Sequence, residues 1–483
     1  MKKLFGTDGM RGEAGRFPLD AATVRTTGRS LARRLAASKG ATPVILTGRD
    51  TRESGEWIER AFTSGAREAG ATCLSAGVIT TPGVAYLART LPTDAGVVVS
   101  ASHNPYHDNG IKIFAPTGRK LDDATERLIE ADIYEAGAAD ASEQNASGQT
   151  AHDGNDAASE SFSSSSQAEG AGRDEPGASG VGPRAADLRE RYLRFLAEEV
   201  AAGLRLDGLK IVADCANGAA YHLAPELLRR VGARVVAVND QPDGRNINRD
   251  CGSLHVEGLG RRVLEEGADL GVAFDGDADR ALFADARGQV VDGDAALWVL
   301  AQRMAERGEL AGGLVVATVM SNVGLEIALR EKGITLLRAD VGDKYVLEEL
   351  LRTGARLGGE QSGHIIFPSV SLAGDGLITT LFVLRALKES GRALHELTEG
   401  FRRYPQVLVN VRVREKRPFA EVSEVARAAR EVEAELGGAG RLLLRYSGTE
   451  PLARVMLEGR DQGEIEGLAA RLAETIGRSL GDV

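Results

Sequence analysis

The sequence predicts an α/β protein of several domains, with parallel or mixed sheets covered by helices. Short apolar runs such as 43–48 (PVILTG) and 95–100 (AGVVVS) alternate with segments of helical periodicity, which is typical of strand–helix–strand units. The chain has 483 residues, more than one ordinary hydrophobic core accommodates. The last part of the chain, from about residue 404, reads as three strands and two helices, which indicates a smaller α+β domain.

Each region supplies elements of this kind. Before residue 136, two helical stretches separate the runs at 43–48 and 95–100. LKIVADCANGAA, ARVVAV and DLGVAFDGDADR form a second block, and GLVVATVMSN and ITLLRAD flank a helix in a third. Identity between the blocks is weak, so their relationship is a structural inference. Segment 137–183 is dominated by Ala, Ser, Gly, Asp and Glu, which predicts a disordered insertion without chemistry.

Charge and composition restrict the function. The net charge is −11, from 59 basic and 70 acidic residues, which disfavours nucleic-acid binding. Any anion site must therefore be built locally, from Arg, Lys, backbone N–H groups or a metal. The three cysteines form no C-x-x-C pair, so neither a disulfide framework nor a zinc site is expected. No signal-peptide pattern and no membrane-length apolar run occurs, so we expect a cytoplasmic protein without a membrane partner.

The stretch FDGDADR (274–280) is the sharpest chemical signal. Asp275, Asp277 and Asp279 follow a buried strand, and carboxylates this close raise one another's pKa unless a cation binds. Their oxygens suit Mg²⁺; the alternative is a solvated acidic turn. An EF-hand is excluded because Arg280 and Ala286 stand where that loop needs Gly and Glu.

The same stretch is also consistent with an aspartyl-phosphate hydrolase. Asp275 would then be the nucleophile and Asp277 the acid and base. Asp279 stands where such enzymes usually have Thr or Val, which weakens this alternative.

A second polar turn, SASHNP, follows the strand that ends near residue 99. It does not match the G-x-S-x-G elbow of serine hydrolases, but a serine can carry a phosphoryl group when a metal supplies the electrostatics. A phosphoserine beside three aspartates requires a bridging cation. A phosphoserine in this turn and a metal site in the acidic turn would therefore account for each other. His103 and Lys112 could move protons or hold charge. The alternative is a capped Asn-Pro turn.

Four further stretches are candidates for binding. RYSGTEPLAR offers Arg445, Ser447, Gly448 and Thr449 to a phosphate, although an ordinary hairpin turn would read similarly. GGEQSGH (358–364) alternates three polar side chains that would share one face of an extended strand and could bind sugar hydroxyls or an amine.

FGTDGMRG and GRDTRESG carry Arg11, Arg49 and Arg52, which are candidates for anion contacts or for salt bridges. No Walker A or G-x-G-x-x-G motif occurs, which disfavours ATP and dinucleotides.

These stretches occur in an order that resembles the α-D-phosphohexomutases. The resemblance covers the chain end to end except segment 137–183. It implies three related α/β domains and a smaller fourth domain around a central cleft, with boundaries at 1–136, 184–290, 291–403 and 404–483.

The resemblance also implies roles for individual residues. Ser102 is the phosphorylated residue, and its phosphate joins Asp275, Asp277 and Asp279 around one Mg²⁺. The loop that recognises the sugar contains Glu360, Ser362 and His364. The clamp on the non-reacting phosphate contains Arg445, Ser447, Gly448, Thr449 and Arg454. Further residues of the cleft are Thr7, Arg11, His103 and Lys112. Lys112 is the leading candidate for general base, a role that requires a lowered pKa.

The implied reaction interconverts glucosamine 6-phosphate and glucosamine 1-phosphate through a 1,6-bisphosphate, towards the amino-sugar nucleotide of cell-wall synthesis. The nearest alternative is the same chemistry on mannose or glucose phosphates, as in phosphomannomutase and phosphoglucomutase. The hydrolase above and a sugar-phosphate-binding protein without catalysis are alternatives of other classes. Members of the family commonly dimerise, so a homodimer is a further expectation.

Overall fold

The first domain is built on a six-stranded mixed sheet in the order β1-β2-β6-β5-β3-β4. In the computed structural model, which describes residues 3–148, 184–447 and 450–481, β5 is buried along its whole length because helices cover both faces. Its elements are β1 (Phe5–Gly6), β2 (Gly9–Glu13), α1 (Ala21–Lys39), β3 (Val44–Arg49), α2 (Gly55–Glu68), β4 (Thr72–Val78), α3 (Thr81–Thr90), β5 (Ala95–Val99), β6 (Asp108–Phe114) and α4 (Asp123–Gly148).

The second and third domains repeat the α/β theme with smaller sheets. Their strand orders are β11-β10-β9-β7-β8 and β13-β12-β14-β15, and each combines parallel and antiparallel pairs. The second domain contains α5 (Ala185–Arg194), the π-helical turn Phe195–Val200, β7 (Lys210–Asp214), α6 (Leu223–Arg230), β8 (Arg234–Val238), α7 (Val256–Glu266), β9 (Leu270–Phe274), β10 (Ala281–Asp285) and β11 (Val290–Val291). The third contains α8 (Gly293–Glu306), β12 (Leu314–Thr318), α9 (Val323–Glu331), β13 (Thr335–Ala339), α10 (Asp343–Thr353), β14 (Gly358–Gly359), β15 (Ile365–Ile366), α11 (Gly376–Ser390) and α12 (Leu394–Leu397).

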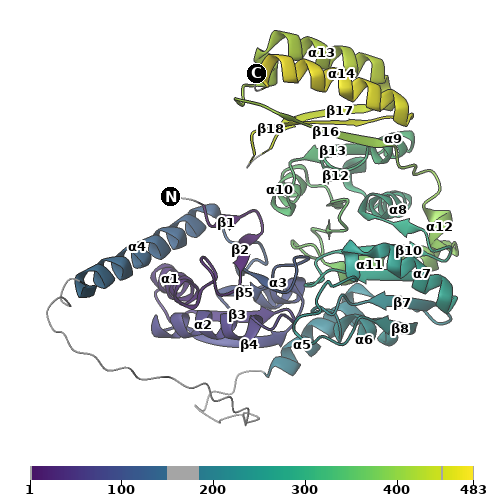
Figure 1. Cartoon of the computed structure of the whole chain (residues 1–483). Coiled ribbons are helices and arrows are strands. Elements are labelled where there is room, and N and C mark those ends of the chain that lie inside the picture. Colours follow the sequence, from purple (N-terminus) through teal and green to yellow (C-terminus); the bar gives the residue numbers. More distant parts are fainter. Residues whose placement is uncertain (1–2, 149–183, 448–449, 482–483) are drawn as a thin grey trace, which may run out of the picture.

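The fourth domain is a three-stranded antiparallel sheet, β16-β18-β17, with two helices on one face (Figure 1). Its elements are β16 (Gln406–Arg412), α13 (Ser423–Leu436), β17 (Arg441–Tyr446), β18 (Leu452–Glu458) and α14 (Gln462–Leu480). The predicted fold class, three α/β domains and a smaller α+β domain, is therefore confirmed.

One hydrophobic core runs through the first three domains, whereas the fourth has its own. Tyr192 of α5 is fully buried at their junction, and its hydroxyl donates to Asp375 Oδ2 at 2.7 Å, at the start of α11. The continuous core fixes the first three domains relative to one another, and so fixes the loops that face the space between them.

The helix α4 corrects one expectation from composition. It continues to Gly148, past the start of the segment 137–183 that was predicted to be disordered. Alanine is abundant from 137 to 148 and has the highest helix propensity, so this composition favours helix as much as disorder. Residues 149–183 lie outside the described residues. No helix in the described ranges is long and apolar enough to span a membrane.

Candidate active site

Ser102 lies in the turn after β5, where the chain adopts a left-handed conformation with φ of 54°. Its side chain is buried, and its Oγ donates to Asp275 Oδ2 at 2.5 Å. The backbone N–H of Ser102 donates to Ser100 Oγ at 2.9 Å. The serine and the acidic turn of the second domain are thus in direct contact, as the sequence argument required.

Glycine permits this contact. A Cβ on Gly276 would lie 2.5 Å from the Ser102 carbonyl oxygen, so a side chain there would force the two loops apart. The acidic turn connects β9 and β10, and Ala278 within it also has a positive φ of 56°.

The three carboxylates of this turn form a site suited to a cation. One oxygen from each of Asp275, Asp277 and Asp279 lies within 4.8 Å of the others, and all three residues are buried. Burial, with the charges of Asp279 and Asp277, raises the pKa of Asp275 well above its ordinary value. Asp277 Oδ1 and Asp279 Oδ1 are buried without a hydrogen-bond partner. Buried carboxylate oxygens without hydrogen bonds, held this close, fit a hard divalent cation such as Mg²⁺.

Lys112 lies on the other side of these carboxylates, fully buried on β6. Its Nζ is 2.8 Å from Asp277 Oδ2 and 3.0 Å from Asp8 Oδ2. Burial opposes its charge, but Asp277, Asp8 and Asp279 outweigh burial and raise the pKa of Lys112 well above its ordinary value. The general base predicted at Lys112 needs a lowered pKa, whereas these carboxylates favour a charge-holding role; the role of Lys112 as base stays a prediction.

His103 has the opposite character. Its Nδ1 lies 3.4 Å from Ser102 Oγ. Burial, with the positive charges of Arg280 and Arg11, lowers the pKa of His103 to about 4. The imidazole is therefore neutral near neutral pH and can accept a proton.

The stretch GGEQSGH forms the loop between β14 and β15, not an extended strand. The N–H of Gly363 donates to the Glu360 carbonyl, so the chain turns within the motif. Ser362 Oγ donates to Glu360 Oε2 at 3.2 Å, and His364 Nδ1 lies 3.6 Å from Asp279 Oδ1. Burial opposes protonation, but Asp279 and Asp343 raise the pKa of His364 to about 9. Ser362 therefore contacts Glu360, whereas His364 lies against Asp279, and the alternation expected of an extended strand is wrong for this loop.

A cavity of about 480 Å³ joins residues from all three α/β domains. Its polar lining includes Thr7, Arg11, His103, Arg280, Asp343, Glu360 and His364. A hexose phosphate needs hydroxyl-binding and cationic groups in one cleft, and this cavity supplies both beside Ser102.

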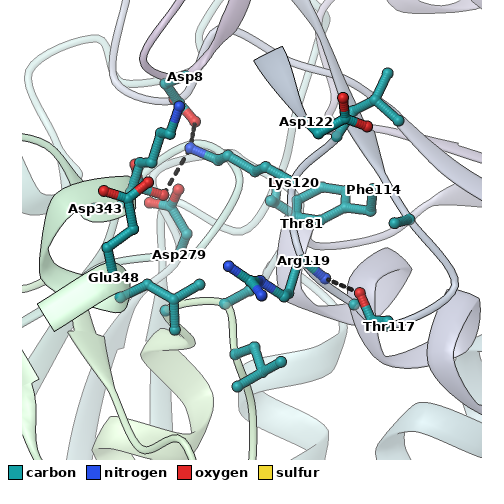
Figure 2. Close-up of a pocket in the computed structure, with 18 of the residues that line it drawn as sticks. Asp8, Thr81, Phe114, Thr117, Arg119, Lys120, Asp122, Asp279, Asp343 and Glu348 are labelled. Atoms are coloured by element: carbon teal, nitrogen blue, oxygen red, sulfur yellow. Dashed lines mark hydrogen bonds and ion pairs between the residues drawn. The ribbon is translucent and has the colours of Figure 1, made fainter. Parts of the chain in front are cut away.

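A second cavity, of about 420 Å³, adjoins the first. Figure 2 shows Lys120 at its wall, reaching between Asp8 and Asp343. Its Nζ lies 2.6 Å from Asp8 Oδ1 and 2.6 Å from Asp343 Oδ2. Because Asp8 and Asp343 belong to the first and third domains, this lysine ties the two sides of the cleft together.

The predicted phosphate clamp lies elsewhere. Arg445 and Arg454 face each other across β17 and β18, and Arg454 NH2 donates to Ser447 Oγ at 3.4 Å. No described residue of the fourth domain lines either cavity above, so the structure does not bring this clamp to the cleft. Gly448 and Thr449 lie outside the described residues.

Other sequence expectations differ from the structure. Arg49 pairs with Glu59 at 2.5 Å, and Arg52 is wholly enclosed, so neither is available to an anion. Sequence reasoning missed Asp8 and Lys120, although Asp8 stands inside the motif FGTDGMRG. That motif was the available signal for Asp8; we find none for Lys120.

The chain matches known proteins over all four domains. The models of the phosphoglucomutase/phosphomannomutase family match α/β/α domain I over 2–140, domain II over 190–288, domain III over 292–404 and the C-terminal domain over 408–475. The phosphoglucosamine mutase of Solibacter usitatus is 48% identical over 481 residues, covering 100% of each chain. That of Mycobacterium tuberculosis is 46% identical, covering 99% of each.

Solved structures support the fold. A phosphoglucomutase/phosphomannomutase family protein from Burkholderia thailandensis superposes with a TM-score of 0.75 at 23% identity, over 99% of this chain and 97% of that one. The N-acetylphosphoglucosamine mutase of Aspergillus fumigatus, solved with GlcNAc-6P and magnesium, gives 0.60 at 18% identity, over 99% and 96%.

The chain belongs to the phosphoglucomutase/phosphomannomutase family, within the α-D-phosphohexomutases. It is an enzyme of the isomerase class. This removes the two alternatives of another class, the aspartyl-phosphate hydrolase and the binding protein without catalysis.

Proposed function

We propose that the protein interconverts glucosamine 6-phosphate and glucosamine 1-phosphate, using Ser102 as the carrier of a phosphoryl group. The observation that supports the carrier best is the 2.5 Å contact between Ser102 Oγ and Asp275 among three buried carboxylates. The choice of amino sugar is supported by the full-length relatives, which bear the name phosphoglucosamine mutase.

The reaction proceeds by two transfers. In the first, the bond between phosphorus and Ser102 Oγ breaks as the free sugar hydroxyl oxygen bonds to phosphorus; the hydroxyl proton leaves to a base, and Ser102 Oγ takes up a proton. The product, glucosamine 1,6-bisphosphate, turns around within the cleft. In the second, Ser102 Oγ gives its proton to a base and bonds to the other phosphorus as the bond between that phosphorus and the sugar oxygen breaks, and the released sugar oxygen takes up a proton. Phosphate is thus conserved, and no water takes part.

Residues around Ser102 would hold the metal ion, keep positive charge in the site and accept a proton. Asp275, Asp277 and Asp279 would hold Mg²⁺ together with the Ser102 phosphate, and the ion when bound neutralises charge on the transferring group. Lys112 keeps positive charge beside the same carboxylates. The neutral imidazole of His103 is the acceptor best placed to take a proton near Ser102.

Binding of the sugar falls to the loop of the third domain. Glu360 and His364 line the same cavity as Thr7 and Arg11, and Ser362 Oγ donates to Glu360; these groups can bind hydroxyl and amino groups. The carboxylate of Glu360 accepts from Ser362 and from the Gly342 N–H and forms no ion pair among the described residues, so it is free to receive the sugar's ammonium.

The fourth domain would clamp the phosphate that does not react. Arg445 and Arg454 are directly opposite each other on neighbouring strands, and like charges in that position repel. A bound phosphate relieves the repulsion and can accept from both guanidinium groups and from Ser447. Gly448 and Thr449 are assigned to this clamp by the family motif. In the cell we place the enzyme in the cytoplasm, and a homodimer stays a prediction.

Two measurements test the proposal. Parallel assays with glucosamine, glucose and mannose 6-phosphates should show the highest kcat/KM for glucosamine 6-phosphate; a preference for either other sugar would establish the alternative mutase activity instead. Mapping by mass spectrometry should place an acid-stable phosphate on Ser102, and Ser102→Ala should lose turnover. Turnover that survives in Ser102→Ala contradicts the carrier.

A further inference from the structure

Arg52 lies beneath the Ser102 turn with its side chain 0% exposed. Its Nε donates to Asp50 Oδ2 at 2.9 Å, and one terminal nitrogen donates to the carbonyls of Ser102 and Asn104, each at 2.9 Å. The other terminal nitrogen donates to the carbonyls of Pro105 and Asp108. A guanidinium has five N–H donors, so every donor of this arginine is used within the protein.

The same arginine also supports Ser102 from the amide side. The Ser102 N–H donates to Ser100 Oγ, and Ser100 Oγ donates to Asp50 Oδ2 at 2.7 Å. Asp50 in turn receives the Arg52 Nε and, through Oδ1, the Arg52 backbone N–H at 3.0 Å. The hydrogen bonds thus form a closed ring through Ser100, Asp50 and Arg52 that binds both the N–H and the carbonyl of Ser102.

This ring of hydrogen bonds stabilises an unusual backbone conformation of Ser102. Ser102 has a φ of 54°, which an L-residue adopts only when its surroundings impose it. Asn248 of the second domain adds a further constraint, because its Nδ2 donates to the Ser102 and Asn104 carbonyls at 2.9 and 3.1 Å. The turn is therefore fixed to the domain that carries the three aspartates.

We propose that Arg52 is a positioning residue for phosphoryl transfer, with Asn248 as its second anchor. Arg52 does not touch the substrate. By holding three carbonyls of the turn and that of Asp108 at the start of β6, it orients Ser102 Oγ towards Asp275, and this inference rests on the proposed function of Ser102 as the carrier. The consequence is kinetic: loosening the turn slows the transfer step while the sugar phosphate still binds.

The test compares Arg52→Lys with Arg49→Lys. Lysine keeps the charge but cannot reach carbonyls on both sides of the turn. We expect kcat to fall on the order of 10²-fold in Arg52→Lys, with KM within about twofold, because small misplacements of a reacting group have effects of that size. Arg49→Lys, in the same stretch but paired with Glu59 away from the turn, should keep the wild-type kcat.

Asn248→Ala is the second variant, for the case in which Arg52→Lys does not fold. It removes one donor to the same two carbonyls, and we expect kcat to fall about tenfold with KM unchanged. Single-turnover transfer from glucosamine 1,6-bisphosphate to Ser102 should slow in step with kcat in both variants. A wild-type transfer rate in a folded Arg52→Lys, or in Asn248→Ala when Arg52→Lys is unfolded, would overturn the inference.

Ser102→Ala in the same experiment separates two kinds of failure. If Ser102→Ala retains turnover, the proposed function fails and this inference fails with it. If Ser102→Ala is inactive while Arg52→Lys transfers phosphate at the wild-type rate, only the role of Arg52 is wrong.

Discussion

The hydroxyl of Ser102 donates a hydrogen bond of 2.5 Å to the carboxylate of Asp275. Phosphorylation replaces the donated proton with a group that carries about two negative charges. The contact then becomes a repulsion between anions in a buried site, where charges interact strongly. The dephosphorylated serine and the phosphoserine therefore differ in their need for a cation.

Magnesium should accordingly stabilise the phosphorylated protein more than the dephosphorylated one. A ligand at 100 times its Kd adds about 2.7 kcal/mol to the free energy of unfolding, so the two forms should separate in Tm when only one is close to saturation. Thermal unfolding of both forms with magnesium and with chelator measures the difference. Ser102→Ala should behave as the dephosphorylated form does, and equal shifts in both forms would contradict the electrostatic argument.

Lys112 should matter for stability as well as for activity. Its ammonium lies between Asp277 and Asp8, and Lys112→Gln would leave the buried carboxylate of Asp277 without its cation, whereas Asp8 keeps its pair with Lys120. We expect the free energy of unfolding in magnesium-free urea to fall by about 3–5 kcal/mol. Lys39→Gln, which breaks an exposed pair with Asp94, is the matched control and should change it by less than about 1 kcal/mol. Wild-type stability in Lys112→Gln would show that Lys112 is not needed to balance these charges.

The fold class could be predicted from local patterns, because buried strands read as apolar runs. The contact between Ser102 and the acidic turn is not local, because the two turns follow β5 and β9, which belong to different sheets. It was predicted from charge: Asp275, Asp277 and Asp279 repel one another, and a phosphoserine beside them requires a cation.

The remaining features depend on tertiary packing. Lys120 bridges Asp8 and Asp343, which are far apart in the sequence, and nothing local marks any of the three as partners. From the sequence, Arg52 was a candidate for an anion contact or a salt bridge, and only the path of the chain over it shows its burial. The raised pKa of Lys112 follows from carboxylates of another domain and from Asp8, so the sequence could not predict it.

The position of the fourth domain should depend on Arg441 and Glu458. The two residues pair at 2.9 Å at the base of the β17–β18 hairpin, and Arg441 also donates to the carbonyls of Val319 and Ser321 in the third domain. Glu458 is fully buried and receives the Val323 N–H at 3.0 Å. The proposed phosphate clamp lies at the opposite end of the same hairpin, so its position depends on this anchor.

Arg441→Met should therefore weaken substrate binding from a distance. We expect KM for glucosamine 6-phosphate to rise on the order of tenfold, which corresponds to a loss of about 1.4 kcal/mol. Steady-state kinetics measures the change, and transfer of phosphate to Ser102 from saturating bisphosphate should stay near the wild-type rate. Arg471→Met, which removes an exposed pair with Glu435 inside the fourth domain, should leave KM unchanged. A wild-type KM in Arg441→Met would show that the anchor does not position the clamp.

Asp294 should make the stability of the protein depend on pH. It is fully buried in the first turn of α8, where burial, with a smaller contribution from Asp292, raises the pKa of Asp294 to about 7. The backbone N–H of Asn322 donates to it at 2.8 Å and opposes this shift without cancelling it. Because the pKa is higher in the folded than in the unfolded chain, the folded state binds more protons between about pH 4 and pH 7. This contribution to stability is therefore lost as the pH rises through that window.

Asp294→Asn keeps the shape and the acceptor for Asn322 but cannot ionise. Relative to wild type, it should gain stability as the pH rises from 4 to 7 and level off above pH 7, at a difference on the order of 2–4 kcal/mol. Urea unfolding of both proteins at several pH values measures the difference. Asp207→Asn, a substitution on the surface, controls for the general effect of removing a carboxylate. A difference that is constant across this range, or that grows on acidification, would mean that Asp294 is ionised in the folded protein throughout.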